Sequence, residues 1–154
     1  MFFSNGNDLI NSLNTGQTLS GLDLGNKTIG VAISDKNLII GSPLKTISRK
    51  GNLKDIESLK IIFEEFNVGG IVLGLPLSLS GEENKNTRKT KEFGEKISST
   101  LLLNIFLQDE RYSSDVIFKE VKNRSISSKK IKKYIDHAAA AYILQGFLDK
   151  YRNK

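Results

Sequence analysis

The feature that most constrains the fold is a short, unbroken apolar segment at residues 71–73. A segment without a polar side is typical of a strand in a parallel sheet that other elements cover on both faces. Gly74 and Pro76 follow it directly, so the strand is expected to leave the sheet there. The segment therefore indicates an α/β architecture.

Strand-like and helix-like patterns alternate along the rest of the chain, as in α/β proteins. A helix is predicted by apolar residues at helical spacing, namely Leu53, Ile56, Leu59, Phe63 and Phe66. A lysine-rich helix is expected through Phe93 and Ile97, and a short strand over residues 104–107. The segment 131–147 has the most regular helical periodicity, which predicts a long final helix.

The first part of the domain is predicted to be a three-strand meander. Its strands are expected around Asp23, over residues 29–33 and over residues 38–40, with turns at 25–27 and 34–37. Residues 1–17 are interpreted as an N-terminal appendage with a short helix, and residues 18–154 as one domain. A chain of 154 residues with 38% hydrophobic content can fill one core.

Composition restricts the chemistry of any site. The chain has no cysteine and only one histidine, His137, which excludes disulfides, thiolate metal sites and a zinc site built from imidazoles. Any metal must be bound by oxygen. The formal charge of +6 suits a polyanionic partner, although a lysine-rich composition with solvated side chains gives the same charge. No membrane-length apolar segment or secretory signal is evident, so a cytoplasmic protein is expected.

Three acidic residues are the candidates for catalysis. Asp23 lies in an apolar strand segment, where an ionised carboxylate is costly without a cation. Glu110 stands at the carboxyl end of a later strand, where ligands of open α/β sheets gather. Asp136 borders the buried stripe of the last helix. Each also has a simpler interpretation: turn capping by Asp23, a surface ion pair of Glu110 with Arg111, or an ordinary helix-surface acid at Asp136.

If these carboxylates meet, they repel one another by about 4 kcal/mol per pair at 4 Å and an effective dielectric constant of 20. They must then take up protons or bind a cation. Oxygen ligands with open coordination positions suit Mg²⁺ or Mn²⁺, which can activate water for phosphodiester hydrolysis. Asp23 is expected to be the bridging or central ligand, with Glu110 and Asp136 completing one metal position each. Asp109 is an alternative to Glu110, because only one of two adjacent strand residues can face the site.

Four motifs together resemble the YqgF/RuvX family, at residues 21–35, 74–77 with Gly81, 109–114 and 136–145. The resemblance extends over roughly residues 19–148. This family has been described as a Holliday-junction-resolvase-like nuclease and as the nuclease that matures the 5′ end of pre-16S ribosomal RNA. The resemblance implies a ribonuclease H-like α/β fold, with a mixed central sheet, helices on both faces and a second strand antiparallel to the first. It also places the acidic site on Asp23, Glu110 and Asp136.

The implied partners are precursor ribosomal RNA or branched DNA, with ribosomal precursor particles as a further candidate. The residues do not distinguish RNA from DNA, nor a monomer from a homodimer. Candidates for binding substrate phosphates lie in or beside the motifs and offer charge or hydroxyl donors: Lys27, Thr28, Arg88, Arg111, Ser113 and Ser114.

The sequence is also compatible with two other classes of function. Residues 23–25 also resemble the first phosphate motif of the actin, sugar-kinase and Hsp70 superfamily, but those proteins pair two such domains and this chain has room for one. The second class is a non-catalytic nucleic-acid-binding protein that acts in transcription or ribosome assembly. The presence of all three acids disfavours it.

Overall fold

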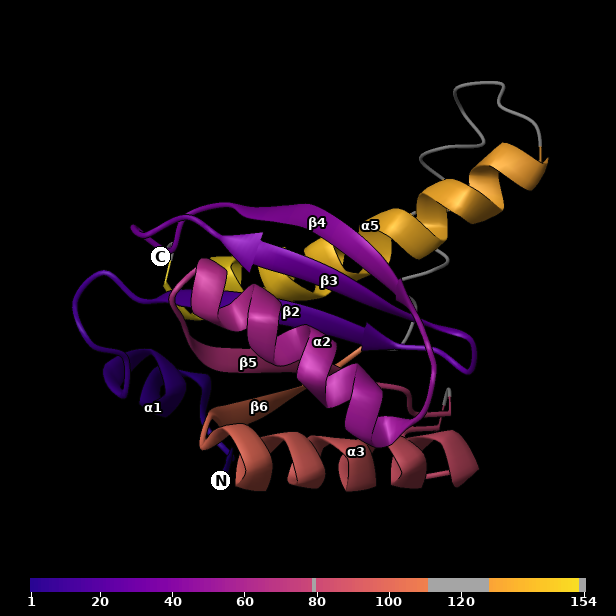
Figure 1. The fold of residues 1–154 in the computed structure, drawn as a ribbon, viewed down its shortest axis with the longest axis horizontal. Coiled ribbons are helices and arrows are strands. Elements are labelled where there is room, and N and C mark those ends of the chain that lie inside the picture. Colours follow the sequence, from indigo (N-terminus) through magenta and orange to yellow (C-terminus); the bar gives the residue numbers. More distant parts are fainter. Residues whose placement is uncertain (79, 111–127, 153–154) are drawn as a thin grey trace.

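A six-stranded mixed sheet forms the centre of the protein (Figure 1). The computed structural model describes residues 1–78, 80–110 and 128–152, with only the backbone for residues 128–137. The strands lie in the order β1 (Phe2–Phe3), β6 (Asn104–Asp109), β5 (Val68–Leu75), β2 (Thr18–Leu24), β3 (Thr28–Ser34) and β4 (Gly41–Ser48). β1, β6, β5 and β2 are parallel, whereas β3 is antiparallel to both β2 and β4. The expected mixed sheet with an antiparallel second strand is confirmed.

Helices cover both faces of this sheet. α2 (Asn52–Glu65) and α3 (Lys85–Leu101) lie on one face, and α5 (Ser128–Tyr151) lies on the other (Figure 1). The short helix α1 (Gly6–Asn11) packs on the α5 side, where Leu9 joins the core. Among the helices of the described residues, none has the length and apolar composition to cross a bilayer.

The central strand β5 is buried on both faces, as its apolar segment predicted. Ile71 and Leu73 point into the core beneath α2 and α3, while Val72 points into the core beneath α5. All three are 0% exposed. Because β5 lies between β2 and β6, it brings the carboxyl ends of these two parallel strands to one edge.

The third strand of the meander was predicted wrongly. It was expected over residues 38–40 but occupies Gly41–Ser48 instead. Leu38 has a φ angle of 58°, which an extended strand cannot accommodate. The Asp35 carboxylate accepts hydrogen bonds from the backbone N–H groups of Ile39 and Ile40, at 2.7 and 3.0 Å. These contacts make residues 35–40 a closed turn, in which Ile39 and Ile40 are exposed.

The N-terminal residues pack against the sheet. Phe2 pairs with Ile105 in the parallel ladder between β1 and β6, and Leu9 of α1 is 0% exposed. The Asn5 side chain caps α1 by accepting from the N–H of Asn7. The division of the chain between residues 17 and 18 stays a prediction.

Candidate active site

Two of the three candidate acids meet at the carboxyl edge of the parallel strands. Asp23 is the penultimate residue of β2, and Glu110 follows directly after β6. The N–H of Glu110 donates to the carbonyl of Leu75 at 3.2 Å, which holds Glu110 against the end of β5. Gly21 faces α5, and side chains two residues apart in a strand share a face. Asp23 therefore also lies on the α5 side of the sheet.

The Glu110 side chain crosses over Gly74 of β5 to reach Asp23. A Cβ atom added to Gly74 would lie 2.8 Å from Oε2 of Glu110 and 2.5 Å from Cδ1 of Ile143 in α5. Both distances are shorter than carbon contacts allow, so only glycine leaves this space open. The glycine in the 74–77 motif thus has a local purpose, which is to admit a carboxyl group between the sheet and the helix.

The electrostatics of this pair are unusual for surface acids. Burial raises the pKa of Glu110 to about 8, helped by the negative charge of Asp23, a hydrogen bond with the Asp23 side chain and the charge of Asp109. Near neutral pH, the two carboxyl groups are held together by a proton that Glu110 retains. A cation in place of that proton would also balance the charge.

Of the two adjacent acids at the end of β6, Glu110 is the one that is hydrogen-bonded to Asp23. Asp109 is exposed and contributes its charge. The choice of Glu110 over Asp109 agrees with this geometry. The catalytic role of Glu110 stays a prediction.

The backbone of α5 brings the third candidate toward the same edge. A Cβ atom on Gly21 would lie 2.7 Å from the carbonyl oxygen of Ala140, so α5 packs almost directly on β2. Asp136 precedes Ala140 by one helical turn. The Asp136 side chain lies outside the described part of the chain, so its contact with Asp23 and Glu110 stays a prediction.

The structure describes three of the six residues that are candidates for binding substrate phosphates. Lys27 is exposed in the turn between β2 and β3, and Thr28 is the half-buried first residue of β3. Arg88 is exposed near the start of α3, a helix tied to the end of β5 by a hydrogen bond from the Thr87 hydroxyl to the Pro76 carbonyl. Lys27 and Arg88 thus follow the strands that build the site. Three further candidates lie outside the described residues: Arg111, Ser113 and Ser114.

Sequence reasoning missed Arg49, which stabilises the turn after Asp23 through hydrogen bonds. Its Nε donates to Oδ2 of Asp55 at 3.1 Å, and its Nη1 donates to the carbonyl of Gly25 at 3.3 Å. Its backbone N–H donates to the carbonyl of Lys27 at 2.9 Å. Asp55 is only 1% exposed and also accepts from the N–H of Lys50 at 2.9 Å. The one sequence signal was an aspartate in the first turn of an amphipathic helix, which ordinary capping explains equally well.

The donor set fits a divalent cation bound by oxygen. Among the described side chains no group of three acids is assembled, so the contribution from this part of the chain is the Asp23 and Glu110 pair. Carboxylate oxygens are the ligands that hard divalent cations prefer, and the half-buried pair has surplus negative charge. Asp136 of α5 stays the predicted third ligand.

The chain matches a known protein family over most of its length. The RuvX family, described as Holliday junction resolvase, matches residues 17–150. A relative from Ruegeria pomeroyi that bears the name pre-16S rRNA nuclease is 43% identical over 135 residues, covering 88% of both chains. A relative of the same name from Bartonella tribocorum is 38% identical and covers 96% of this chain and 94% of its own.

One solved structure shows the fold. It is T. thermophilus RuvC in complex with a Holliday junction substrate, with a TM-score of 0.54 and 10% sequence identity. The match covers 87% of this chain and 96% of that chain. The ribonuclease H-like fold, expected from the four motifs, is confirmed.

Proposed function

Because the chain belongs to the RuvX family and is therefore a nuclease that hydrolyses phosphodiester bonds, we propose that its substrate is the 5′ end of precursor 16S ribosomal RNA. The relatives that share its sequence over most of its length are named for this substrate. We place the reaction in the cytoplasm, on free precursor RNA or on ribosomal precursor particles. End trimming needs one active site, so a monomer suffices.

The observation that supports this function most directly is the contact between Asp23 and Glu110. The pKa of Glu110 is raised by burial and by the contact with Asp23, so placing these two carboxyl groups together is unfavourable unless a cation binds there. Divalent metals are general among nucleases of this kind. We propose Mg²⁺ or Mn²⁺, with Asp23 as the central ligand and Glu110 and Asp136 completing the site.

When bound, the metal supplies an activated water and stabilises the leaving oxygen of an in-line displacement. The protein's own residues position the reactants. Gly74 leaves space for the Glu110 carboxyl beside Asp23, and a hydrogen bond from Arg49 to the Gly25 carbonyl fixes the turn that follows Asp23. We propose that Lys27 and Arg88, with Thr28, Arg111, Ser113 and Ser114, bind phosphates on either side of the cleaved bond.

Cleavage of two matched substrates tests the proposal. Precursor 16S RNA and four-way-junction DNA are each incubated with the protein and Mg²⁺ or Mn²⁺, comparing wild type, Asp23→Asn and Glu110→Gln. Glu92→Gln, at an exposed position on α3, is the matched control. Wild type and control are expected to shorten the RNA at its 5′ end, and the two site variants to lose that activity.

Cleavage of the junction DNA alone would favour the resolvase reaction of the RuvX description instead. RNA binding with no cleavage, unchanged by Asp23→Asn, would favour a non-catalytic role.

A further inference from the structure

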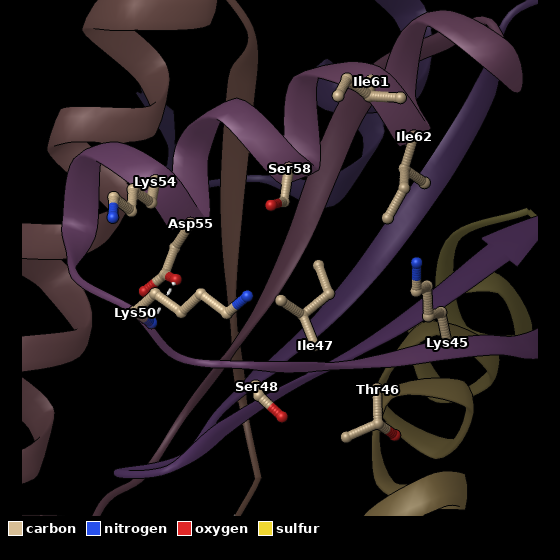
Figure 2. Close-up of a pocket in the computed structure, with 10 residues that line it drawn as sticks. All are labelled: Lys45, Thr46, Ile47, Ser48, Lys50, Lys54, Asp55, Ser58, Ile61 and Ile62. Carbon is tan, nitrogen blue, oxygen red and sulfur yellow. Dashed lines mark hydrogen bonds between the residues drawn. The ribbon is translucent and has the colours of Figure 1, made fainter.

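A hollow of about 380 Å³ lies between the edge strand β4 and helix α2, on the face of the sheet opposite α5 (Figure 2). Three exposed lysines line it: Lys45 in β4, Lys50 before α2 and Lys54 in the first turn of α2. Figure 2 shows the ammonium groups of Lys45 and Lys50 extending into the space between the helix and the strand. The hydroxyl of Ser58 points into the same space.

The positive charge of this hollow is not neutralised by its own residues. Its one acidic lining residue, Asp55, is occupied by Nε of Arg49 at 3.1 Å and by the N–H of Lys50 at 2.9 Å. Within the part of the chain that the structure describes, none of the three lysines forms an ion pair, whereas Lys91 on α3 pairs with Glu83. The hollow therefore attracts anions.

The N-terminus of α2 adds to the positive electrostatic potential of the hollow. A helix N-terminus has a partial positive charge, and a lysine in the first turn is unfavourable there. Gly51, the N-cap residue, supplies no side chain to accept from the helix N–H groups. The Lys54 side chain is exposed, so the packing of α2 does not depend on its positive charge. An anion near Lys50 and Lys54 would stabilise both the lysines and the helix.

Hydrogen bonds connect the residue before Lys50 to the turn after Asp23, although the hollow and the Asp23 side chain lie on opposite faces of the sheet. Arg49, next to Lys50, donates to the carbonyls of Gly25 and Lys27. From Lys54 to Ile61 the helix side of the hollow extends roughly 10 Å, at 1.5 Å per residue. That length exceeds the spacing of neighbouring phosphates in a strand, so the hollow can contact more than one phosphate.

We propose that this hollow binds the phosphodiester backbone of the nucleic acid substrate, several nucleotides away from the bond that is cleaved. The proposal rests on the proposed nuclease function. It assigns Lys45 and Lys50 to substrate binding and gives them no part in the chemical step. Because phosphates are common to RNA and DNA, both are expected to bind here equally well.

The test measures salt-dependent binding by full-length protein in an Asp23→Asn background, which prevents cleavage. The double variant Lys45→Gln with Lys50→Gln is compared with Lys60→Gln with Lys96→Gln, which removes the same charge from exposed positions of α2 and α3 outside the hollow. The ligands are labelled precursor RNA and single-stranded DNA of the same sequence.

The hollow variant is expected to lose two phosphate contacts to a single strand. The slope of the logarithm of the binding constant against the logarithm of the salt concentration should then decrease in magnitude by about 1.4, and binding should weaken about 25-fold at 0.1 M salt. The control pair should change neither quantity. Equal weakening by the two pairs would overturn the proposal, because it would mean that only net charge matters. A loss confined to RNA would overturn recognition through the backbone.

A cleavage experiment separates this proposal from the proposed function. With Asp23 intact, the hollow variant should raise KM for the long precursor while leaving kcat, and cleavage of an oligonucleotide too short to reach the hollow, unchanged. If wild type cleaves and the variant's KM is unchanged, the hollow proposal alone fails. If wild type neither binds nor cleaves the precursor, the proposed function fails.

Discussion

Replacing Glu110 with glutamine should stabilise the metal-free protein. Glu110 has a pKa of about 8 in the folded state against an ordinary value of 4.5, because of burial and its contact with Asp23. Between these values the unfolded chain is ionised at this position and the folded chain is protonated. The stability of wild type therefore decreases as pH rises from 4.5 to 8, by up to about 1.4 kcal/mol per pH unit, and then levels off.

At pH 7 this penalty amounts to about 3 kcal/mol as an upper limit, from 2.5 pH units above the ordinary value. Glutamine is neutral at every pH and can donate to the Asp23 carboxylate, so Glu110→Gln removes the penalty. For a domain of this size, 1 kcal/mol corresponds to roughly 2–4 °C in Tm, which predicts an increase of roughly 6–12 °C.

The assay is thermal denaturation in EDTA at several pH values from 5 to 8, with Glu92→Gln as the exposed control. As pH rises from 5 to 8, the Tm of wild type and control should fall more steeply than the Tm of Glu110→Gln. The difference in Tm should be greatest at pH 8. If Glu110→Gln melts at or below wild type throughout, or keeps the same pH slope, the reasoning about the buried carboxyl pair is wrong.

Three further predictions follow from the same geometry. Gly74→Ala places a methyl group against the ends of the Glu110 and Ile143 side chains, which can yield, so cleavage should fall about 100-fold while Tm changes little; a large loss of Tm with normal kcat per folded molecule would contradict this. Arg49→Ala leaves the buried Asp55 without its ion-pair partner and should lower the free energy of unfolding by about 3 kcal/mol in urea denaturation, with Arg49→Lys intermediate. Mn²⁺ at 100 times its Kd should stabilise wild type at pH 7 by about 2.7 kcal/mol in calorimetry but have little effect on Asp23→Asn; equal stabilisation of both proteins would place the metal elsewhere.

The sequence was most informative where a pattern had one physical meaning. The apolar segment of β5 has no polar face, so only a strand covered on both sides satisfies it, and Val72 and Leu73 lie in the two cores as expected. Asp23 was recognisable because a carboxylate in an apolar strand requires compensation. The ribonuclease H-like fold and its antiparallel second strand came from the resemblance of the four motifs, since periodicity alone does not determine which strands pair. The order of the strands is visible only in the structure.

Other features depend on contacts between distant residues. Ile39 and Ile40 look like strand residues, but the Asp35 carboxylate closes a turn around them, and this cannot be read from hydrophobicity. Arg49 lies 24 residues from Gly25, so its hydrogen bond to that carbonyl is visible only in the fold. The space that Gly74 leaves for Glu110 depends on the distance between β5 and α5, which no local pattern specifies.

The central claim is that Asp23 and Glu110 hold the metal with which this protein cleaves its substrate. Anomalous diffraction from crystals grown with Mn²⁺ tests it most directly. We predict a peak within coordination distance of both carboxyl groups, with Asp136 as a third ligand. Crystals of protein that cleaves precursor RNA in Mn²⁺, but that show Mn²⁺ only at other positions, would contradict the account.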